Sequence, residues 1–207
     1  MNIYAFGSIC RGDVSPTSDI DVLVIGDDDG MINKDIFTHY KPSGILNLWI
    51  TGNPFAWHLY LESRLVYSSD GEDFISTLGS PQPYRQGTSD CEKFRALFHE
   101  AWNSLLNSRE TEVYDLSVVF LSLRNFATCY SLSNSPKPNF SRRSALALGD
   151  RSIPVSATAF AALEQARMLS VRGRGSEPTA SEVEEAMASL PLISQWMDGL
   201  LEEQTAL

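Results

Sequence analysis

Long apolar runs, paired cysteines and clustered histidines are all scarce in this chain of 207 residues. No apolar run approaches the roughly 18 residues that a membrane-spanning helix requires, so we expect no membrane segment. The first residues have no basic stretch ahead of an apolar one, so we expect no signal peptide. The three cysteines form no C-x-x-C pair, which argues against a disulfide scaffold and for a reducing, cytoplasmic setting. The three histidines are scattered, which argues against a zinc site.

The charge balance is strongly acidic, with 26 Asp and Glu against 16 Lys and Arg and a net charge of −10. A surface of that sign repels nucleic acids and anionic membranes in bulk, so we expect neither as a general partner. It leaves room for a local basic site, or for a nucleotide held through a metal ion. Apolar residues make up 43% of the chain, which is the composition of a globular protein with a buried core.

The residue pattern changes near the middle of the chain. Before residue 80, short β-branched and apolar runs alternate with turns, which is typical of a sheet. The strands that we expect there are 2–6, 19–25, 45–51 and 64–68. The helices that we expect between them are 31–40 and 55–63. The segment 79–88 is rich in Gly and Pro and is interpreted as a linker.

Beyond the linker, apolar residues recur every three or four positions, which predicts amphipathic helices. The helices that we expect there are 90–107, 110–132, 155–171 and 191–204. Ser181 and Glu184 fit a capping box ahead of the last one. The sequence therefore predicts an α/β (α+β) protein, with a small mixed β-sheet domain at 1–80 followed by an α-helical bundle domain at 90–207.

Two acidic residues on the expected strand 19–25 are the clearest sign of chemistry. Asp19 and Asp21 are two positions apart, so both side chains point to the same side of the strand. Carboxylates about 6 Å apart repel by roughly 3 kcal/mol at an effective dielectric constant near 20. A divalent cation removes this conflict, and Mg²⁺ favours one or two carboxylates together with phosphate oxygens.

A Gly-Ser pair follows the first expected strand and completes the pattern. Gly7 permits close approach of a ligand, and backbone N–H groups with the Ser8 hydroxyl can bind a phosphate. Arg11 lies about one turn further on and can bind a phosphate through its fork of donors. An anion-binding site next to a metal site is the combination that phosphoryl or nucleotidyl transfer requires.

The combined pattern of Gly7-Ser8-x-x-Arg11-Gly12, a short loop and Ser18-Asp19-x-Asp21 resembles the nucleotidyltransferase superfamily of DNA polymerase β. The likeness is to its minimal and antibiotic-modifying branches. It is close over residues 3–25 and looser to about residue 78.

The resemblance implies that two Mg²⁺ (or Mn²⁺) ions lie between Asp19, Asp21 and the triphosphate of ATP or another nucleoside triphosphate. Gly7, Ser8 and Ser18 would bind the nucleotide, and Arg11 would orient the loop or touch phosphate. A hydroxyl of an acceptor then attacks the α-phosphorus and pyrophosphate leaves. The acceptor can be a cationic small molecule, a protein tyrosine or an RNA end, and the acidic surface favours the first.

Two departures from the family pattern favour an alternative function. The family usually supplies a third carboxylate from a later strand, but the expected strand 45–51 offers only Asn47, an uncharged candidate metal ligand. Members also carry a helix before the first strand, and here that helix is absent or supplied by another chain. The alternative is a catalytically impaired binding protein that acts as the partner or antitoxin of another protein, and a homodimer is also open.

The helical half offers further candidates of lower specificity. Asp115 shares a helix face with Glu112 and is a candidate base for the acceptor hydroxyl. Arg124-Asn125 matches the start of the HEPN ribonuclease motif, but no histidine follows at the required spacing, so we expect no RNA cleavage. Arginines at 142–143 and 167–174 form local positive patches that can receive a polyanion, although helix-end arginines are the simpler interpretation.

Overall fold

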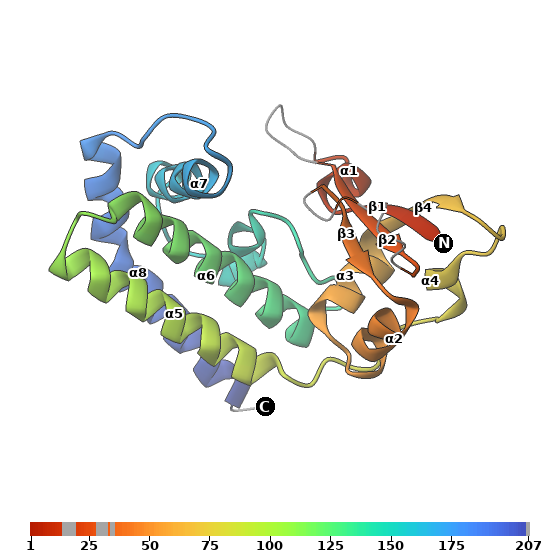
Figure 1. Ribbon diagram of the computed structural model, residues 1–207. Coiled ribbons are helices and arrows are strands. Elements are labelled where there is room, and N and C mark those ends of the chain that lie inside the picture. The colour runs from red at the N-terminus through yellow and green to blue at the C-terminus, as the bar shows by residue number, and fades with distance from the viewer. Residues whose placement is uncertain (14–19, 28–32, 34–35, 206–207) are drawn as a thin grey trace. The chain divides into compact units, whose positions relative to one another are not determined.

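The structure is a computed structural model that describes residues 1–13, 20–27, 33 and 36–205. The chain forms two compact units, Met1–Arg85 and Gln86–Leu207 (Figure 1). We call them the sheet unit and the helical unit and describe each by itself.

Within the described residues, the sheet unit contains one mixed sheet with the strand order β3-β2-β1-β4. The central strand β1 (Asn2–Phe6) pairs antiparallel with β2 (Asp21–Ile25) and with β4 (Ser63–Ser68). The short strand β3 (Thr38–Tyr40) runs parallel to β2. The mixed sheet expected from the sequence is therefore confirmed, together with its first, second and last strands.

One face of this sheet forms the core of the unit. Tyr4 lies opposite Leu23 in the β1–β2 pair, and their side chains are fully buried. Helices α2 (Pro42–Ile50), α3 (Pro54–Glu62) and α4 (Phe74–Thr77) supply the other side of the core. The buried core side chains are Tyr4, Phe6, Leu23, Ile25, Ile45, Trp49, Ala56, Leu59 and Ile75.

Two expectations for the middle of this unit are wrong. Residues 45–50 of the expected strand 45–51 belong to helix α2, and residues 38–40 of the expected helix 31–40 form strand β3. Pro42 favours the formation of α2, because its fixed φ suits the first position of a helix. Ile45 and Trp49 are four residues apart and both buried, so the run follows a helical period and not the alternation of a strand.

The helical unit is built around α6 (Glu112–Asn134). It packs against α5 (Gly87–Asn107) and α7 (Ala157–Arg172), and α8 (Ala180–Thr205) packs against α5 and α7. Figure 1 shows these helices side by side as a bundle. The expected helical fold of this part of the chain is therefore confirmed. Apolar residues at every third or fourth position give each helix an apolar face, and packing against neighbouring helices buries that face.

The last helix differs from its expected form. α8 begins at Ala180 instead of residue 191 and continues through Pro191. Its capping box is formed by Thr179 and Glu182, because the Thr179 N–H donates to Glu182 Oε2 at 2.7 Å and the Glu182 N–H points back to Thr179 Oγ1 at 3.4 Å. The box expected at Ser181 is therefore displaced by two residues.

Within the described residues, none of the helices combines the length and the apolar character needed to cross a lipid bilayer.

Candidate active site

The turn after β1 brings Gly7 against the first residue of β2. Phe6, the last residue of β1, pairs with Asp21, the first residue of β2. Asp21 therefore lies at the end of the sheet where the Gly7 turn begins. Gly7 has φ +74° and ψ −139°, a conformation that side-chain-bearing residues rarely adopt. A Cβ atom built on Gly7 would stand 2.6 Å from Asp21 Oδ2, so a side chain at this position would force the Asp21 carboxylate to move.

Helix α1 (Ser8–Arg11) starts directly at this turn. The Gly7 carbonyl accepts hydrogen bonds from the Cys10 and Arg11 N–H groups, at 3.1 and 3.3 Å. Gly12 ends the helix in the left-handed conformation, with φ +74°, which accounts for the Arg-Gly pair in the motif. The Gly-Ser turn and the Asp21 carboxylate are thus held together by strand pairing on one side and a helical turn on the other.

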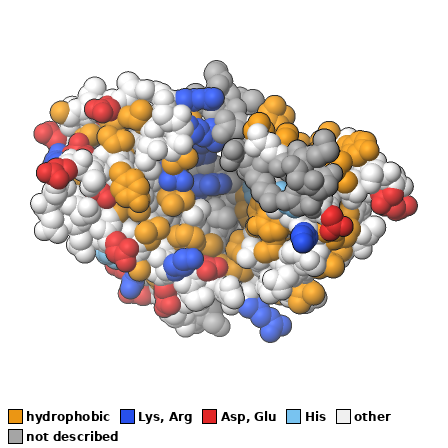
Figure 2. Space-filling view, in the orientation of Figure 1, with side chains coloured by type: hydrophobic (Ala, Val, Ile, Leu, Met, Phe, Trp, Pro, Cys, Tyr) orange, Lys and Arg blue, Asp and Glu red, His pale blue; other side chains and the backbone are white. Residues whose placement is uncertain are grey.

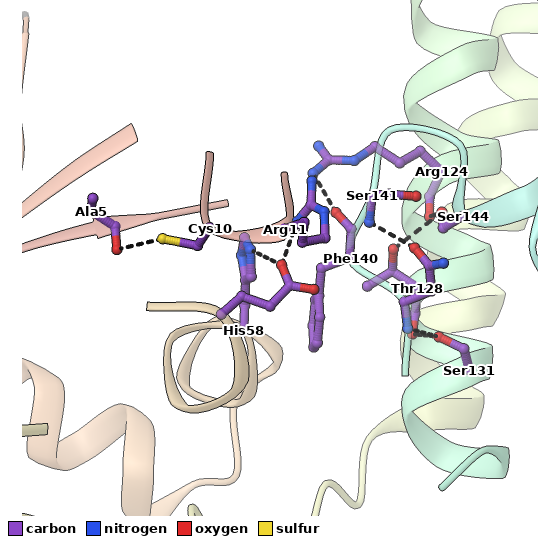
Figure 3. A network of polar contacts seen from close by, with 12 residues as sticks. Ala5, Cys10, Arg11, His58, Arg124, Thr128, Ser131, Phe140, Ser141 and Ser144 are labelled. Atoms are coloured by element: carbon purple, nitrogen blue, oxygen red, sulfur yellow. Dashed lines mark hydrogen bonds and ion pairs between the residues drawn. The ribbon is translucent and has the colours of Figure 1, made fainter. Parts of the chain in front are cut away.

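Arg11 is held by an ion pair within the sheet unit. Its guanidinium contacts the carboxylate of Glu62 on α3, and His58 Nε2 lies 3.0 Å from the same Glu62 oxygen. Figure 3 shows Arg11 and His58 turned toward one point between α1 and α3. Of the two roles implied by the family resemblance, this contact supports the one in which Arg11 positions the Gly-Ser loop.

The environment of Glu62 keeps it ionised. Burial by itself would raise the pKa of this carboxyl group, but hydrogen bonds from His58 and Arg11 outweigh it and hold the pKa below the usual value. The His58 ring also packs edge-on against Phe6, with ring centroids 5.6 Å apart. Arg11 and Glu62 therefore form an ion pair that joins α1 to α3, and His58 connects this pair to the hydrophobic core through Phe6.

His58 and Glu62 did not emerge from the sequence as site residues. A signal was present, because a His and a Glu four positions apart share one face of the helix expected at 55–63. The contact of Glu62 with Arg11 spans 51 positions, and a local sequence pattern does not reveal a contact between residues so far apart.

Two of the expected site residues, Ser18 and Asp19, lie outside the described residues. Asp21 is described, and its side chain is exposed. Within the part of the chain that the structure describes, no group of three or more His, Cys, Asp or Glu side chains is arranged to hold a metal ion. The structure therefore tests the position of one member of the Asp pair and leaves the pair itself a prediction.

The premise for Asn47 as a metal ligand is wrong. Asn47 lies on α2 with an exposed side chain, and not on a strand beside β2. The next described strand after β2 is β3, whose residues Thr38, His39 and Tyr40 are not acidic. Asp35, the acidic residue nearest before β3 in the sequence, lies outside the described residues.

Asp115 already has polar partners inside the helical unit. Its carboxylate is buried and accepts hydrogen bonds from Ser104 Oγ at 2.9 Å and Thr111 Oγ1 at 2.8 Å. These contacts join the end of α5 to the start of α6. They support a structural role for Asp115, and its assignment as a catalytic base stays a prediction.

The segment compared with the HEPN ribonuclease motif is also part of the helical core. Arg124 donates to the Phe140 carbonyl at 3.4 Å, and Figure 3 shows its side chain reaching toward that loop. The positions where the ribonuclease motif needs a histidine hold Cys129, Tyr130 and Ser131, and all three are buried. Burial supports a packing role for these three residues, and the absence of RNA cleavage stays a prediction.

Comparison with known families finds a similarity in the N-terminal part of the chain. Residues 1–54 match the family model described as the nucleotidyltransferase domain. This segment contains the Gly7 turn, α1 and the β1–β2 pair. This part of the sheet unit is therefore similar to a nucleotidyltransferase domain, which is consistent with the superfamily of DNA polymerase β. No curated protein matches the chain.

Proposed function

We propose that the chain is a Mg²⁺-dependent nucleotidyltransferase that moves a nucleoside monophosphate, AMP from ATP, to a hydroxyl group of an acceptor. The observation that carries this proposal is the contact at Gly7. A Cβ there would stand 2.6 Å from Asp21 Oδ2, so a phosphate bound to the Gly7–Ser8 backbone would lie next to a carboxylate. Phosphate and carboxylate repel each other unless a cation lies between them.

The described residues suit such a cation. Asp21 offers an exposed carboxylate, the kind of oxygen donor that Mg²⁺ or Mn²⁺ prefers, and the bare backbone of Gly7 leaves space for phosphate. When bound, the metal would neutralise charge on the phosphates and favour departure of pyrophosphate. Asp19 completes the proposed ligand set, and Asn47 is left out because it lies on α2.

The other residues position the nucleotide. Ser8 opens α1, and its hydroxyl and the N–H groups of the turn would bind the β- and γ-phosphates. Arg11, anchored on Glu62, holds α1 in place. In the reaction a bond forms between the acceptor oxygen and the α-phosphorus. The bond from that phosphorus to the bridging oxygen breaks, pyrophosphate leaves with the electron pair, and the acceptor proton passes to solvent.

The test of this proposal uses transfer of radiolabel from α-labelled ATP to a panel of small-molecule, protein and RNA acceptors. Asp21→Asn keeps the size of the side chain and removes its charge, so we expect transfer to fall by about a hundredfold or more. Asp27→Asn is the matched control, because Asp27 is an exposed aspartate just beyond the other end of β2.

The control variant should transfer label as the wild type does. Label transfer by Asp21→Asn at the wild-type rate would contradict the proposal. The alternative, a non-catalytic binding protein, rested partly on Asn47 as a substitute for a third carboxylate on a strand. The position of Asn47 on α2 removes that ground.

A further inference from the structure

A cluster of arginines on the helical unit carries more positive charge than its neighbours neutralise. Arg142 and Arg143, in the loop after α6, both approach Glu164 on α7, at 3.7 and 3.0 Å. Arg167 lies three positions beyond Glu164 and so on the same face of α7. Two guanidinium groups therefore share one carboxylate, and a third arginine lies about one helical turn away on α7, in a chain whose net charge is −10. In Figure 2, Lys and Arg side chains gather beside α7.

Arg167 is the unusual member of this cluster. Its side chain is half-buried, and its hydrogen bond goes to Ser117 Oγ on α6 at 3.4 Å. Among the residues that the structure describes, no carboxylate forms an ion pair with it. Burial lowers the pKa of Arg167, and the nearby charge of Arg172 lowers it further. A partly desolvated cation without an anionic partner costs stability, so its presence calls for a ligand.

An exposed aromatic ring adjoins the same surface. Tyr114 lies close enough to Arg167 to influence its pKa, and it is 60% exposed. Tyr114 and Ser117 are three positions apart on α6 and share the face that meets Arg167. Guanidinium groups beside an exposed aromatic ring are the pairing that binds single-stranded nucleic acids, because the cations hold phosphates and the ring stacks on a base.

We propose that Tyr114, Arg142, Arg143 and Arg167 form a binding site for the phosphate backbone of a short single-stranded nucleic acid. A single phosphate would need one fork of donors, whereas this cluster presents arginines from a loop and from a helix. The overall negative charge of the chain limits binding to this local surface. The inference goes beyond the proposed transfer reaction, since binding here requires neither metal nor ATP.

The experiment measures anisotropy of a fluorescein-labelled single-stranded RNA of about twelve nucleotides with the full chain, in EDTA. Arg167→Met keeps the length of the side chain and removes its charge. We expect its dissociation constant to rise about tenfold, and the slope of log affinity against log salt to shrink by about one. Arg95→Ala is the control, because Arg95 is an arginine of α5 paired with Asp198 at 2.7 Å, and it should bind as the wild type does.

Thermal unfolding separates a ligand-binding arginine from a structural one. If Arg167 is retained for binding, Arg167→Met should unfold at the same temperature as the wild type or higher, because a half-buried unpaired charge has been removed. A lower unfolding temperature with unchanged RNA affinity would mean that Arg167 is structural and would overturn the proposal. Absence of RNA binding by the wild type would overturn it as well.

A second arm identifies the source of the phosphates. Inorganic tripolyphosphate should displace the RNA only weakly, because it has no base to stack on Tyr114. Tight binding of tripolyphosphate without binding of RNA would contradict a nucleic-acid site. Repeating the titration with Asp21→Asn keeps this test separate from the transfer reaction: loss of transfer with intact RNA binding would leave the site standing.

Discussion

At the scale of single residues, Gly7 is the position where the fold and the proposed chemistry meet most closely. Replacement by alanine forces a side chain into a positive-φ conformation and into the Asp21 carboxylate. We expect Gly7→Ala to lose roughly 1–2 kcal/mol of stability from the backbone alone. We also expect its affinity for ATP to fall about tenfold or more, because the carboxylate must move.

Calorimetry with ATP and Mg²⁺, together with urea unfolding, checks this expectation. Gly12→Ala is the control, since Gly12 also has φ +74° but no atom of the described residues lies within 4 Å of the added Cβ atom. It should lose some stability and keep its affinity for ATP. Equal losses of affinity in the two variants would show that backbone strain, and not the contact with Asp21, is responsible.

Residue identities predicted some of this site and not the rest. The Gly-Ser turn and Asp21 are predictable as site residues because they belong to a short sequence motif. Pairing of β1 with β2 then brings them together. The contact of Arg11 with Glu62 was not found, because a pair separated by 51 positions leaves no local trace. The sequence pattern therefore identifies the groups that act, and the fold identifies the groups that hold them.

At the scale of elements, the link between α1 and α3 is the feature open to test. Glu62→Gln keeps a hydrogen-bond acceptor and removes the charge that faces half-buried Arg11. We expect a loss of roughly 1–3 kcal/mol in the free energy of unfolding at about pH 7. Urea unfolding measures it, and Glu72→Gln, at an exposed position of the same unit, should change stability little.

The pH dependence of this loss has a definite sign. The pKa of Glu62 is lowered in the folded chain, so its stabilising effect is complete above the usual carboxyl pKa of 4.5 and is lost as pH falls through the lowered value. The difference between wild type and Glu62→Gln should therefore shrink on acidification below about pH 4.5. A difference that stays constant to lower pH would show that the charge on Glu62 is not what joins α1 to α3.

Helices and strands were predictable from the sequence where the spacing of apolar residues clearly matched one of the two. β1, β4, α3, α5, α6 and α7 agree with their expected ranges to within three residues, whereas α8 begins eleven residues earlier than expected. Residues 45–51 form a short, nearly continuous apolar run, and such a run fits both a buried strand and a buried helix. The deciding signal was Pro42 ahead of the run, which favours the first turn of a helix. The capping box was misplaced for a similar reason, since Thr179 and Ser181 each have Glu three positions later.

At the scale of the whole molecule, the chain combines a segment that matches the nucleotidyltransferase domain model, residues 1–54, with a separate helical unit. The family match ends at residue 54, so the helical unit has to be interpreted from its own surface. The net charge of −10 argues against nucleic acids as bulk partners, but net charge describes only the average surface. The arginines around Glu164 show that local charge can oppose the average, which composition does not report.

The central claim is that the Gly7 turn and Asp21 bind a nucleoside triphosphate together with a divalent cation. The most direct measurement is isothermal titration calorimetry of the full chain with a non-hydrolysable ATP analogue, with and without Mg²⁺. The account predicts binding that requires Mg²⁺ in the wild type, persists in Asp27→Asn and is lost in Asp21→Asn. Binding of the analogue with equal affinity in the absence of Mg²⁺, or unchanged in Asp21→Asn, would contradict it.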